Sequence, residues 1–320
     1  MFWVKIRSMD IFSVSKLGFG TSRIGGTSLL NGKRIDAKPI SKRDALGILK
    51  YAYDSGINFF DTSDTYGNAE ELLGEAFSKV RQNVVIATKC GLTSEKERNF
   101  SVPYINSCIE SSLRRLKTDY IDIFQLAKPE VEHVNGELLE FFEKKIKEGV
   151  IRYFGISVIE NDDSHVYLRT GIITSFQIFY NLLFVSSHEL INKCARKDRF
   201  VIIRSPLNSG ILSGTYTVET KFDKLDSKNK IFCSKLLEER LKYVNRVRRH
   251  FDLSMNEVMS FSLNFIFSNT NVNVVIPAAS DIRQLEAYIK IFNSEKRFGE
   301  SEINEIVKFV KSENMAYSLS

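Results

Sequence analysis

The sequence predicts an α/β fold, a single (β/α)8 TIM barrel domain that spans residues 1–320. Eight short apolar runs rich in β-branched and aromatic residues alternate with segments whose apolar residues recur every three to four positions. This alternation is typical of a parallel sheet covered by amphipathic helices. No low-complexity linker divides the chain, and eight repeating units favour a closed barrel over an open sheet.

The predicted strands are short and mostly apolar. They lie at residues 17–22, 57–63, 83–89, 120–127, 152–158, 175–181, 199–207 and 272–278. Ahead of the first strand, residues 11–20 are expected to form a small hairpin that plugs the barrel floor. Residues 208–234 break the alternating pattern and predict a long loop after the seventh strand.

Helices are predicted between the first strands, where amphipathic segments carry recognisable start and stop residues. These segments are 41–56, 68–80, 102–117 and 135–149. In the first of them, Ser41 can cap the amino end, Asp44 occupies the capping-box position and Gly56 follows as a stop. The local signals therefore agree with the barrel pattern.

A glycine-rich segment near the amino end, GFGTSRIGG at residues 18–26, invites comparison with the dinucleotide-binding fingerprint. That fingerprint requires the spacing GxGxxG directly after the first strand, because each glycine has a separate role at the pyrophosphate. The spacing differs in this chain. A Rossmann domain is therefore the weaker interpretation of the strand and helix pattern.

The charge balance argues against a nucleic-acid or membrane role. The chain has 45 Lys and Arg against 39 Asp and Glu, a net charge of +6, and the basic residues are mixed with acidic ones. The exception is a short block made of Arg246, Arg248, Arg249 and His250. Because nucleic-acid binding requires clustered basic residues with aromatic stacking groups, a small polar or anionic substrate is the simpler expectation.

Cysteine spacing and the first residues indicate a cytoplasmic protein without a predicted metal site. Neither CxxC pairs nor zinc-type Cys/His spacings occur among Cys90, Cys108, Cys194 and Cys233. The opening segment is interrupted by Lys5, Arg7 and Asp10, unlike the apolar core of a signal peptide, and no run reaches membrane-spanning length. Reduced thiols in the cytoplasm are the natural interpretation.

Reactive side chains occur at the expected strand ends. Asp61 ends the second strand, Tyr66 follows in the turn DTSDTYGNAE, and Lys89 ends the third strand in VVIATK. In a barrel of this type the active site lies at the carboxyl ends of the strands, so these three side chains should share one bowl. Each alone is ordinary, but together they predict a catalytic group.

The segment FFDTSDTYGNAEELLGEAF followed by VVIATK resembles the signature of aldo-keto reductases. The resemblance covers nearly the whole chain and continues through SLRRLKTDYIDIFQL, IRYFGIS, FQIFYN, IIRSPLNSGILSG and VVIPAAS. It implies an NADP-dependent oxidoreductase that transfers hydride between NADPH and a carbonyl or alcohol. The family uses an Asp, Tyr, Lys and His tetrad, and the first three match Asp61, Tyr66 and Lys89.

Elementary chemistry supports these implied roles. A phenol is a poor proton donor near neutrality, and an adjacent ammonium improves it by stabilising the phenolate. Lys89 can supply that ammonium, and Asp61 can hold its charge, because an unpaired buried ammonium tends to lose its proton. Tyr66 is then expected to be the general acid that protonates the developing alkoxide.

The chain departs from the family at the fourth strand, where FQLAKPE places Ala127 at the position of the histidine. Alanine cannot donate a hydrogen bond to the substrate oxygen. Loss of one such donor typically costs roughly 10²–10³ in rate, against total enhancements of about 10⁶ or more. An active enzyme is therefore still expected, and Lys128 and His133 are candidates to replace the donor.

The resemblance also implies a cofactor site. Ser157, Gln177 and Arg204 match positions that hold the nicotinamide. The phosphates are expected at two segments that offer hydroxyls, glycine amides and a helix amino end. These candidates are Ser205, Leu207, Ser209 and Gly210 in the first segment, and Ser280 and Gln284 in the second. Arg283 is a candidate to face the 2′-phosphate, and the resemblance favours NADP over NAD, chiefly because the family generally uses NADP.

Two alternatives to carbonyl reduction follow from the missing histidine. In the first, the chain is a catalytically weakened, cofactor-binding relative with a regulatory role, as in the potassium-channel β subunits of this family. In the second, it reduces activated carbon–carbon double bonds. Retention of Asp61, Tyr66 and Lys89 together argues against simple decay of the active site.

Overall fold

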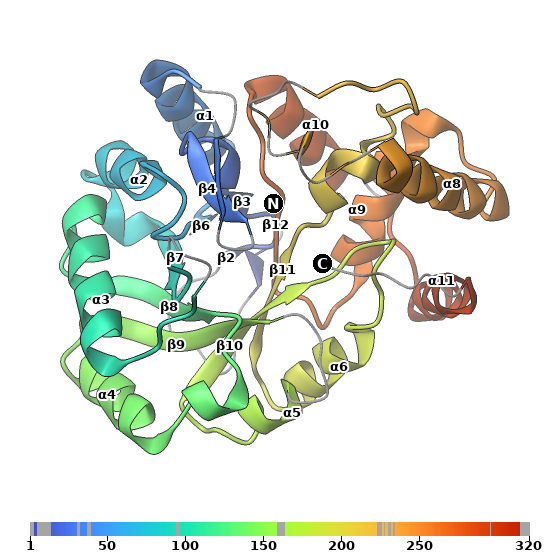
Figure 1. Cartoon of the computed structure of the whole chain (residues 1–320). Helices are drawn as coiled ribbons and strands as arrows, with labels where there is room; N and C mark the ends of the chain where they lie inside the picture. The colour runs from blue at the N-terminus through green and yellow to red at the C-terminus, as the bar shows by residue number, and fades with distance from the viewer. Residues whose placement is uncertain are drawn as a thin grey trace.

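A computed structural model describes residues 3–4, 14–30, 33–36, 40–93, 97–158, 164–222, 226, 228–229, 232, 234–294 and 296–313. Within these residues, eight parallel strands form one sheet at the centre of the molecule (Figure 1). The strands are β3 (Phe19–Gly20), β6 (Phe59–Asp61), β7 (Val85–Cys90), β8 (Ile121–Ala127), β9 (Ile151–Val158), β10 (Ile173–Phe179), β11 (Phe200–Arg204) and β12 (Val274–Ile276). Their order in the sheet follows their order in the chain, as a barrel requires.

The sheet closes because its first and last strands meet. The Gly18 amide donates to the Val275 carbonyl at 2.8 Å, and the Gly20 amide donates to the Pro277 carbonyl at 3.0 Å. In return, the Val275 amide donates to the Lys16 carbonyl at 2.8 Å. These parallel contacts complete the ring of strands, so the predicted (β/α)8 barrel is confirmed.

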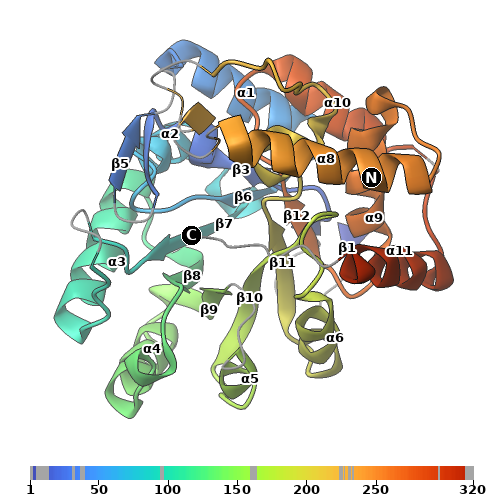
Figure 2. The same ribbon diagram turned by 45° about the vertical axis from the view of Figure 1, so that its right-hand side comes forward.

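Helices surround the barrel on its outer face (Figures 1 and 2). They are α1 (Lys42–Asp54), α2 (Ala69–Phe77), α3 (Val102–Leu116), α4 (Gly136–Lys147), α5 (Ser164–Tyr167), α6 (His188–Arg196), α8 (Ser234–His250), α9 (Val258–Ser268), α10 (Ile282–Phe292) and α11 (Glu300–Ser312). Short 3-10 turns are η1 (Thr21–Arg23), η2 (Arg81–Asn83), η3 (Val131–His133), η4 (Asn208–Ser213) and η5 (Met255–Glu257). The α1 amino end is capped as predicted, since the Ser41 hydroxyl accepts from the Asp44 amide at 3.1 Å.

Strand alternation divides the apolar core into two layers. A small inner cluster fills the lower barrel, and a larger outer cluster lies between the strands and the helices. The inner cluster is made of Val14, Phe59, Val85, Ala87, Ile123, Phe200, Ile202, Val274 and Ile276. Because successive side chains of a strand point to opposite faces, residues two positions beyond this cluster line the barrel mouth.

A hairpin forms ahead of the first barrel strand, but one of its two strands differs from the prediction. β2 (Val14–Ser15) pairs antiparallel with β1 (Trp3–Val4), so the second arm comes from ahead of residues 11–20. Val14 is buried in the inner cluster, which fits a plug at the barrel floor. Residues 11–13 lie outside the described part of the chain.

The other sequence predictions agree with the structure apart from their ends. Strand β11 stops at Arg204 rather than residue 207, because Ser205 adopts a left-handed backbone with φ 55°. The described part of segment 208–234 is mostly loop after the η4 turn. A hairpin of β4 (Thr27–Leu30) and β5 (Lys33–Asp36) was not predicted. Among the described helices, none combines the length and apolar content needed to cross a membrane.

Candidate active site

The centre of the site is a buried ion pair between neighbouring strands. Asp61 ends β6, and Lys89 lies beside it near the end of β7. The Lys89 Nζ donates to Asp61 Oδ2 at 2.8 Å and to the Thr62 carbonyl at 2.8 Å. Both side chains are less than a tenth exposed. The structure therefore brings together two of the three predicted catalytic residues.

Two further strands hold the Asp61 carboxylate in place. Gln177 on β10 donates from Nε2 to Asp61 Oδ1 at 2.5 Å. The Gln177 Oε1 in turn accepts from the Ser157 hydroxyl of β9 at 3.0 Å. Ser157 and Gln177 were predicted to bind the cofactor, and here they also form a chain of buried polar groups that orients the ion pair. Fully satisfied buried networks of this kind are rigid.

Tyr66 completes the group from the turn between β6 and α2. The Lys89 Nζ lies 4.8 Å from the centroid of the Tyr66 ring. The turn is held by the Tyr66 amide, which donates to the Ser63 carbonyl at 3.1 Å, and by the Asn68 amide, which donates to the Gly25 carbonyl at 3.1 Å. A Cβ at Gly25 would lie 1.8 Å from the Tyr66 carbonyl oxygen, so only glycine fits there.

The charge of Lys89 depends on its neighbours. Burial opposes the ammonium form, but the charges of Asp61 and Tyr66 outweigh burial and raise the pKa of Lys89 above its usual value. A desolvated Lys without such partners would instead lose its proton. Lys89 is thus held as a cation beside the Tyr66 ring.

Arg204 supplies a second cation at the mouth, at the end of β11. Its Nε and Nη2 atoms are buried and have no hydrogen-bond partner among the described residues. Burial lowers the pKa of Arg204, and Tyr66 and Asp61 oppose this effect. Its Cζ lies 5.1 Å from the ring centroid of Phe179 on β10. Because buried guanidinium groups are normally hydrogen-bonded, these atoms fit a ligand with acceptor oxygens.

The first predicted phosphate segment has an unusual backbone after β11. Ser205, Asn208, Ser209 and Gly210 all have positive φ values, between 46° and 93°. Runs of such conformations turn backbone amides towards one side and make concave anion sites. Leu207 precedes this run of η4 and is buried. The amides of Asn208 and Gly210 donate within the turn to the Ser205 and Leu207 carbonyls, at 3.0 and 2.9 Å, so the role of this segment in phosphate binding stays a prediction.

The second predicted phosphate segment lies where β12 leads into α10. The Ser280 amide donates to Gln284 Oε1 at 3.1 Å, and the Asp281 carboxylate caps the helix by accepting from the Gln284 amide at 3.0 Å. Gln284 is therefore already engaged with Ser280. Arg283 is exposed and forms no ion pair with any residue that the structure describes.

The loop after β11 reaches back to the start of the barrel. Arg23 in η1 donates from both terminal nitrogens to the two oxygens of Asp226, each at 3.1 Å. Both elements follow strand ends at the same edge of the barrel. The bidentate pair therefore holds this loop beside the site.

Comparisons with known proteins decide the family. A model of the Aldo/keto reductase family matches residues 16–311. The chain belongs to this family. The predicted oxidoreductase class is thereby confirmed at the level of the family.

Individual relatives agree with the family match. The chain is 31% identical to "Uncharacterized oxidoreductase YqkF" of Bacillus subtilis, over 97% of this chain and 96% of the relative. It is 30% identical to an NADH-specific methylglyoxal reductase of Escherichia coli, over 67% and 70% of the two chains. Among solved structures, aldo-keto reductase AKR11C1 from Bacillus halodurans (holo form) superposes with a TM-score of 0.78 at 26% identity, covering 97% and 96%.

Ala127, which the sequence analysis matched to the histidine position of the aldo-keto reductases, is the last residue of β8. Ala127 pairs with Ser157 of β9, so it lies beside the Asp61 network. Two residues earlier on the same face, the Gln125 side chain is fully buried, and both of its polar atoms lack a partner among the described residues. The sequence analysis missed Gln125, although strand alternation from Ala127 could have found it.

The two predicted replacements for the histidine differ in their surroundings. His133 accepts from the Glu130 amide at Nδ1 and packs on the Phe100 ring at 4.7 Å between centroids. Lys128 follows the end of β8 with a left-handed backbone, φ 55°, so strand alternation no longer fixes its direction. Burial, followed by the charges of Arg204 and Arg98, lowers the pKa of Lys128 to about 8. Lys128 therefore lies within electrostatic reach of Arg204.

Proposed function

We propose that this chain is a single-domain, NADP(H)-dependent aldo-keto reductase that interconverts a carbonyl and an alcohol, with Tyr66 as the general acid. The observation that carries the proposal is the position of the Lys89 ammonium. It lies between the Asp61 carboxylate, at 2.8 Å, and the Tyr66 ring, 4.8 Å from its centroid. Burying a charge is costly, so a site that had lost its catalytic role would have no reason to keep a buried ammonium group.

The chain's own residues organise the proton transfer. A bound NADPH would supply the hydride to the carbonyl carbon. Tyr66 then donates its phenolic proton to the developing alkoxide, and the Lys89 ammonium stabilises the phenolate that remains. Asp61 keeps Lys89 charged, while Gln177 and Ser157 hold Asp61 in one orientation. The reverse reaction returns the proton to Tyr66.

The residues proposed for the cofactor follow the ends of β11 and β12. Arg204 offers buried N–H groups at the mouth that have no partner among the described residues. Ser205, Ser209 and Gly210 have a left-handed backbone, Leu207 lies between them, and Ser280 and Gln284 lie at the amino end of α10. We propose Arg283 as the contact of the 2′-phosphate, since its charge is exposed at the first turn of that helix. The Escherichia coli relative is named as NADH-specific, so the preference requires a direct test.

The substrate class follows from the charges near Ala127. Arg204 and Lys128 are two cations within electrostatic reach of each other at the barrel mouth. Removal of an imidazole also leaves more room beside Tyr66. We therefore propose a polar or anionic carbonyl compound, with Lys128 as a donor to the substrate in place of the histidine. Its pKa of about 8 leaves the ammonium form available at neutral pH.

The test is a fluorescence titration with NADPH and NADH, followed by turnover measurements on aldehydes, 2-oxo acids and enones. The proposal predicts tighter NADPH binding and turnover of carbonyl compounds, with anionic ones preferred. Tight binding without turnover on any compound would identify a cofactor-binding relative instead. Turnover of enones alone would identify a carbon–carbon double-bond reductase.

A further inference from the structure

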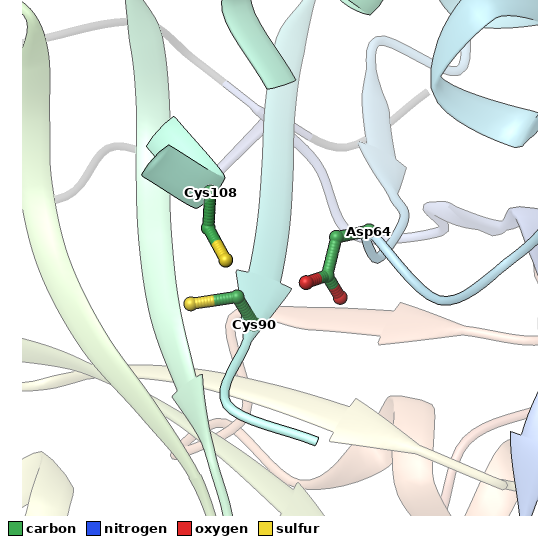
Figure 3. A group of neighbouring side chains, drawn as sticks. All are labelled: Asp64, Cys90 and Cys108. Carbon is green, nitrogen blue, oxygen red and sulfur yellow. The ribbon is translucent and has the colours of Figure 1, made fainter. Parts of the chain in front are cut away.

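Three potential metal ligands meet behind the catalytic turn, on the outer side of the barrel wall. Asp64 lies in the turn that leads to Tyr66, Cys90 directly follows Lys89 at the end of β7, and Cys108 projects from α3 (Figure 3). Their carboxylate and sulfur atoms all lie within 4.8 Å of one another. They come from three separate elements, which is why the cysteine spacing in the sequence did not indicate a site.

The Asp64 carboxylate forms no ion pair in the described part of the chain. The Ser63 hydroxyl donates to it at 3.1 Å, but no Lys or Arg side chain among the described residues forms an ion pair with it. Two charged side chains act on it, Glu70 and the Arg115 that pairs with Glu70 at 2.6 Å, and Arg115 opposes the effect of Glu70. Burial, and then the Glu70 charge, raise the pKa of Asp64 to about 7. The group thus has the surroundings of a carboxylate that would gain from a bound cation.

The two thiols are buried and lie close to each other and to this carboxylate (Figure 3). Cys90 is 1% exposed and Cys108 is 8% exposed. A hydrogen bond from Cys90 lowers the pKa of Cys108, whereas burial raises the pKa of Cys90 well above its usual value. The pKa shifts thus make Cys108 the more readily deprotonated of the two thiols. The thiolate is the form of cysteine that binds metals, and soft cations prefer thiolate ligands.

We propose that Asp64, Cys90 and Cys108 bind a thiophilic divalent cation of the Zn²⁺ class. With metal–sulfur bonds of about 2.3 Å, tetrahedral ligands lie about 3.8 Å apart, so small side-chain rotations would bring the three donors into place. The fourth position would take water, as in sites with three protein ligands. The bound ion would replace protons on both sulfurs and neutralise Asp64.

Such an ion would connect the Tyr66 turn to β7 and to α3. Asp64 is two residues from Tyr66, and Cys90 is adjacent to Lys89. Coordination would therefore restrict the backbone on both sides of the proton-transfer pair without entering the barrel mouth. The site is separate from the cofactor and substrate positions, so its test does not depend on the proposed reaction.

The test is a titration of the full chain, kept reduced, with Co²⁺ as a spectroscopic probe and Zn²⁺ as competitor. We expect one equivalent of Co²⁺ to give thiolate-to-metal charge-transfer absorption that Zn²⁺ abolishes. The C108S and D64N variants should each weaken binding by at least about 10-fold, since even residues around the ligands contribute that much. The matched control is Cys194→Ser, because Cys194 is also fully buried but lies on α6, apart from this cluster.

The possible outcomes distinguish metal binding at this cluster from metal binding elsewhere in the chain. Loss of the absorption in C108S, a weaker affinity in D64N and an unchanged titration in C194S would support the site. No thiolate absorption in the native chain, or the same titration in C108S as in the native chain, would overturn it. If C108S does not fold, D64N decides, because Asn keeps the size of Asp and removes only the charge.

Discussion

The buried ion pair of the site makes a sharp prediction for the Asp61→Asn variant. The substitution keeps the side-chain size and removes the charge that Lys89 meets at 2.8 Å. The new carboxamide oxygen could still accept a hydrogen bond from Gln177 or Lys89, but it carries no charge to balance the ammonium. Removal of one partner of a buried pair typically costs about 3–5 kcal/mol, because the other charge stays buried without compensation.

The chain contains a matched control for this change. Lys50 and Asp54 form a Lys–Asp pair at 2.6 Å on α1, but their side chains are 76% and 54% exposed. The same substitution there, Asp54→Asn, should change the free energy of unfolding by less than about 0.5 kcal/mol. Urea denaturation of both variants at pH 7 measures the difference. Equal stabilities for the two variants would refute the view that Asp61 neutralises a buried cation.

The pH dependence gives the sign of the effect independently. In the native chain the pKa of Lys89 is raised above the value in the unfolded chain. The stability that Lys89 contributes is therefore full below the unfolded-state pKa and is lost only as the pH rises through the folded-state pKa. Without Asp61, burial would dominate and the pKa of Lys89 would fall below its usual value. The folded variant then binds fewer protons than its unfolded chain, and its stability rises with pH. The deficit relative to the native chain should therefore shrink from pH 7 to pH 10.

Three further predictions test the site residue by residue. If Lys128 donates to the substrate in place of the histidine, Ala127→His should change turnover of simple aldehydes by less than about 10-fold. A gain of roughly 10²–10³, with NADPH still bound, would mean that no group fills the role in the native chain. Arg283→Ala should weaken NADPH binding at least about 10-fold and leave NADH binding unchanged, as measured by cofactor fluorescence. The same NADPH affinity in the variant and the native chain would show that Arg283 does not contact the 2′-phosphate. Gly25→Ala should lower kcat at least about 10-fold by displacing the Tyr66 turn. Its control, Gly47→Ala, meets no atom within 4 Å on α1 and should leave kcat unchanged.

The barrel was predictable from the sequence because local patterns determine it. Parallel strands buried on both faces give continuous apolar runs, and the first runs in this chain alternate with amphipathic helices. The grouping of Asp61, Lys89 and Tyr66 followed from a rule of the fold, that strand ends meet at one mouth. Element ends were less certain, as at Ser205, where one left-handed residue ends β11 early.

The remaining features depend on contacts between distant parts of the chain. The Gln177 bond to Asp61 joins residues more than a hundred positions apart, and no local pattern indicates it. Cys90 and Cys108 have no motif spacing, and they meet Asp64 only because α3 packs against β7. Gln125 was accessible to sequence reasoning through its two-residue offset from Ala127, but its lack of partners becomes visible only in three dimensions.

The most direct test of the central claim is the kcat of the Tyr66→Phe variant with NADPH and the best carbonyl substrate. The substitution removes only the hydroxyl and keeps the ring against Lys89. If Tyr66 is the general acid, kcat should fall by about 10²-fold or more while the NADPH dissociation constant stays within a factor of about two. An unchanged kcat in Tyr66→Phe would contradict the account, because the proton would then come from another group.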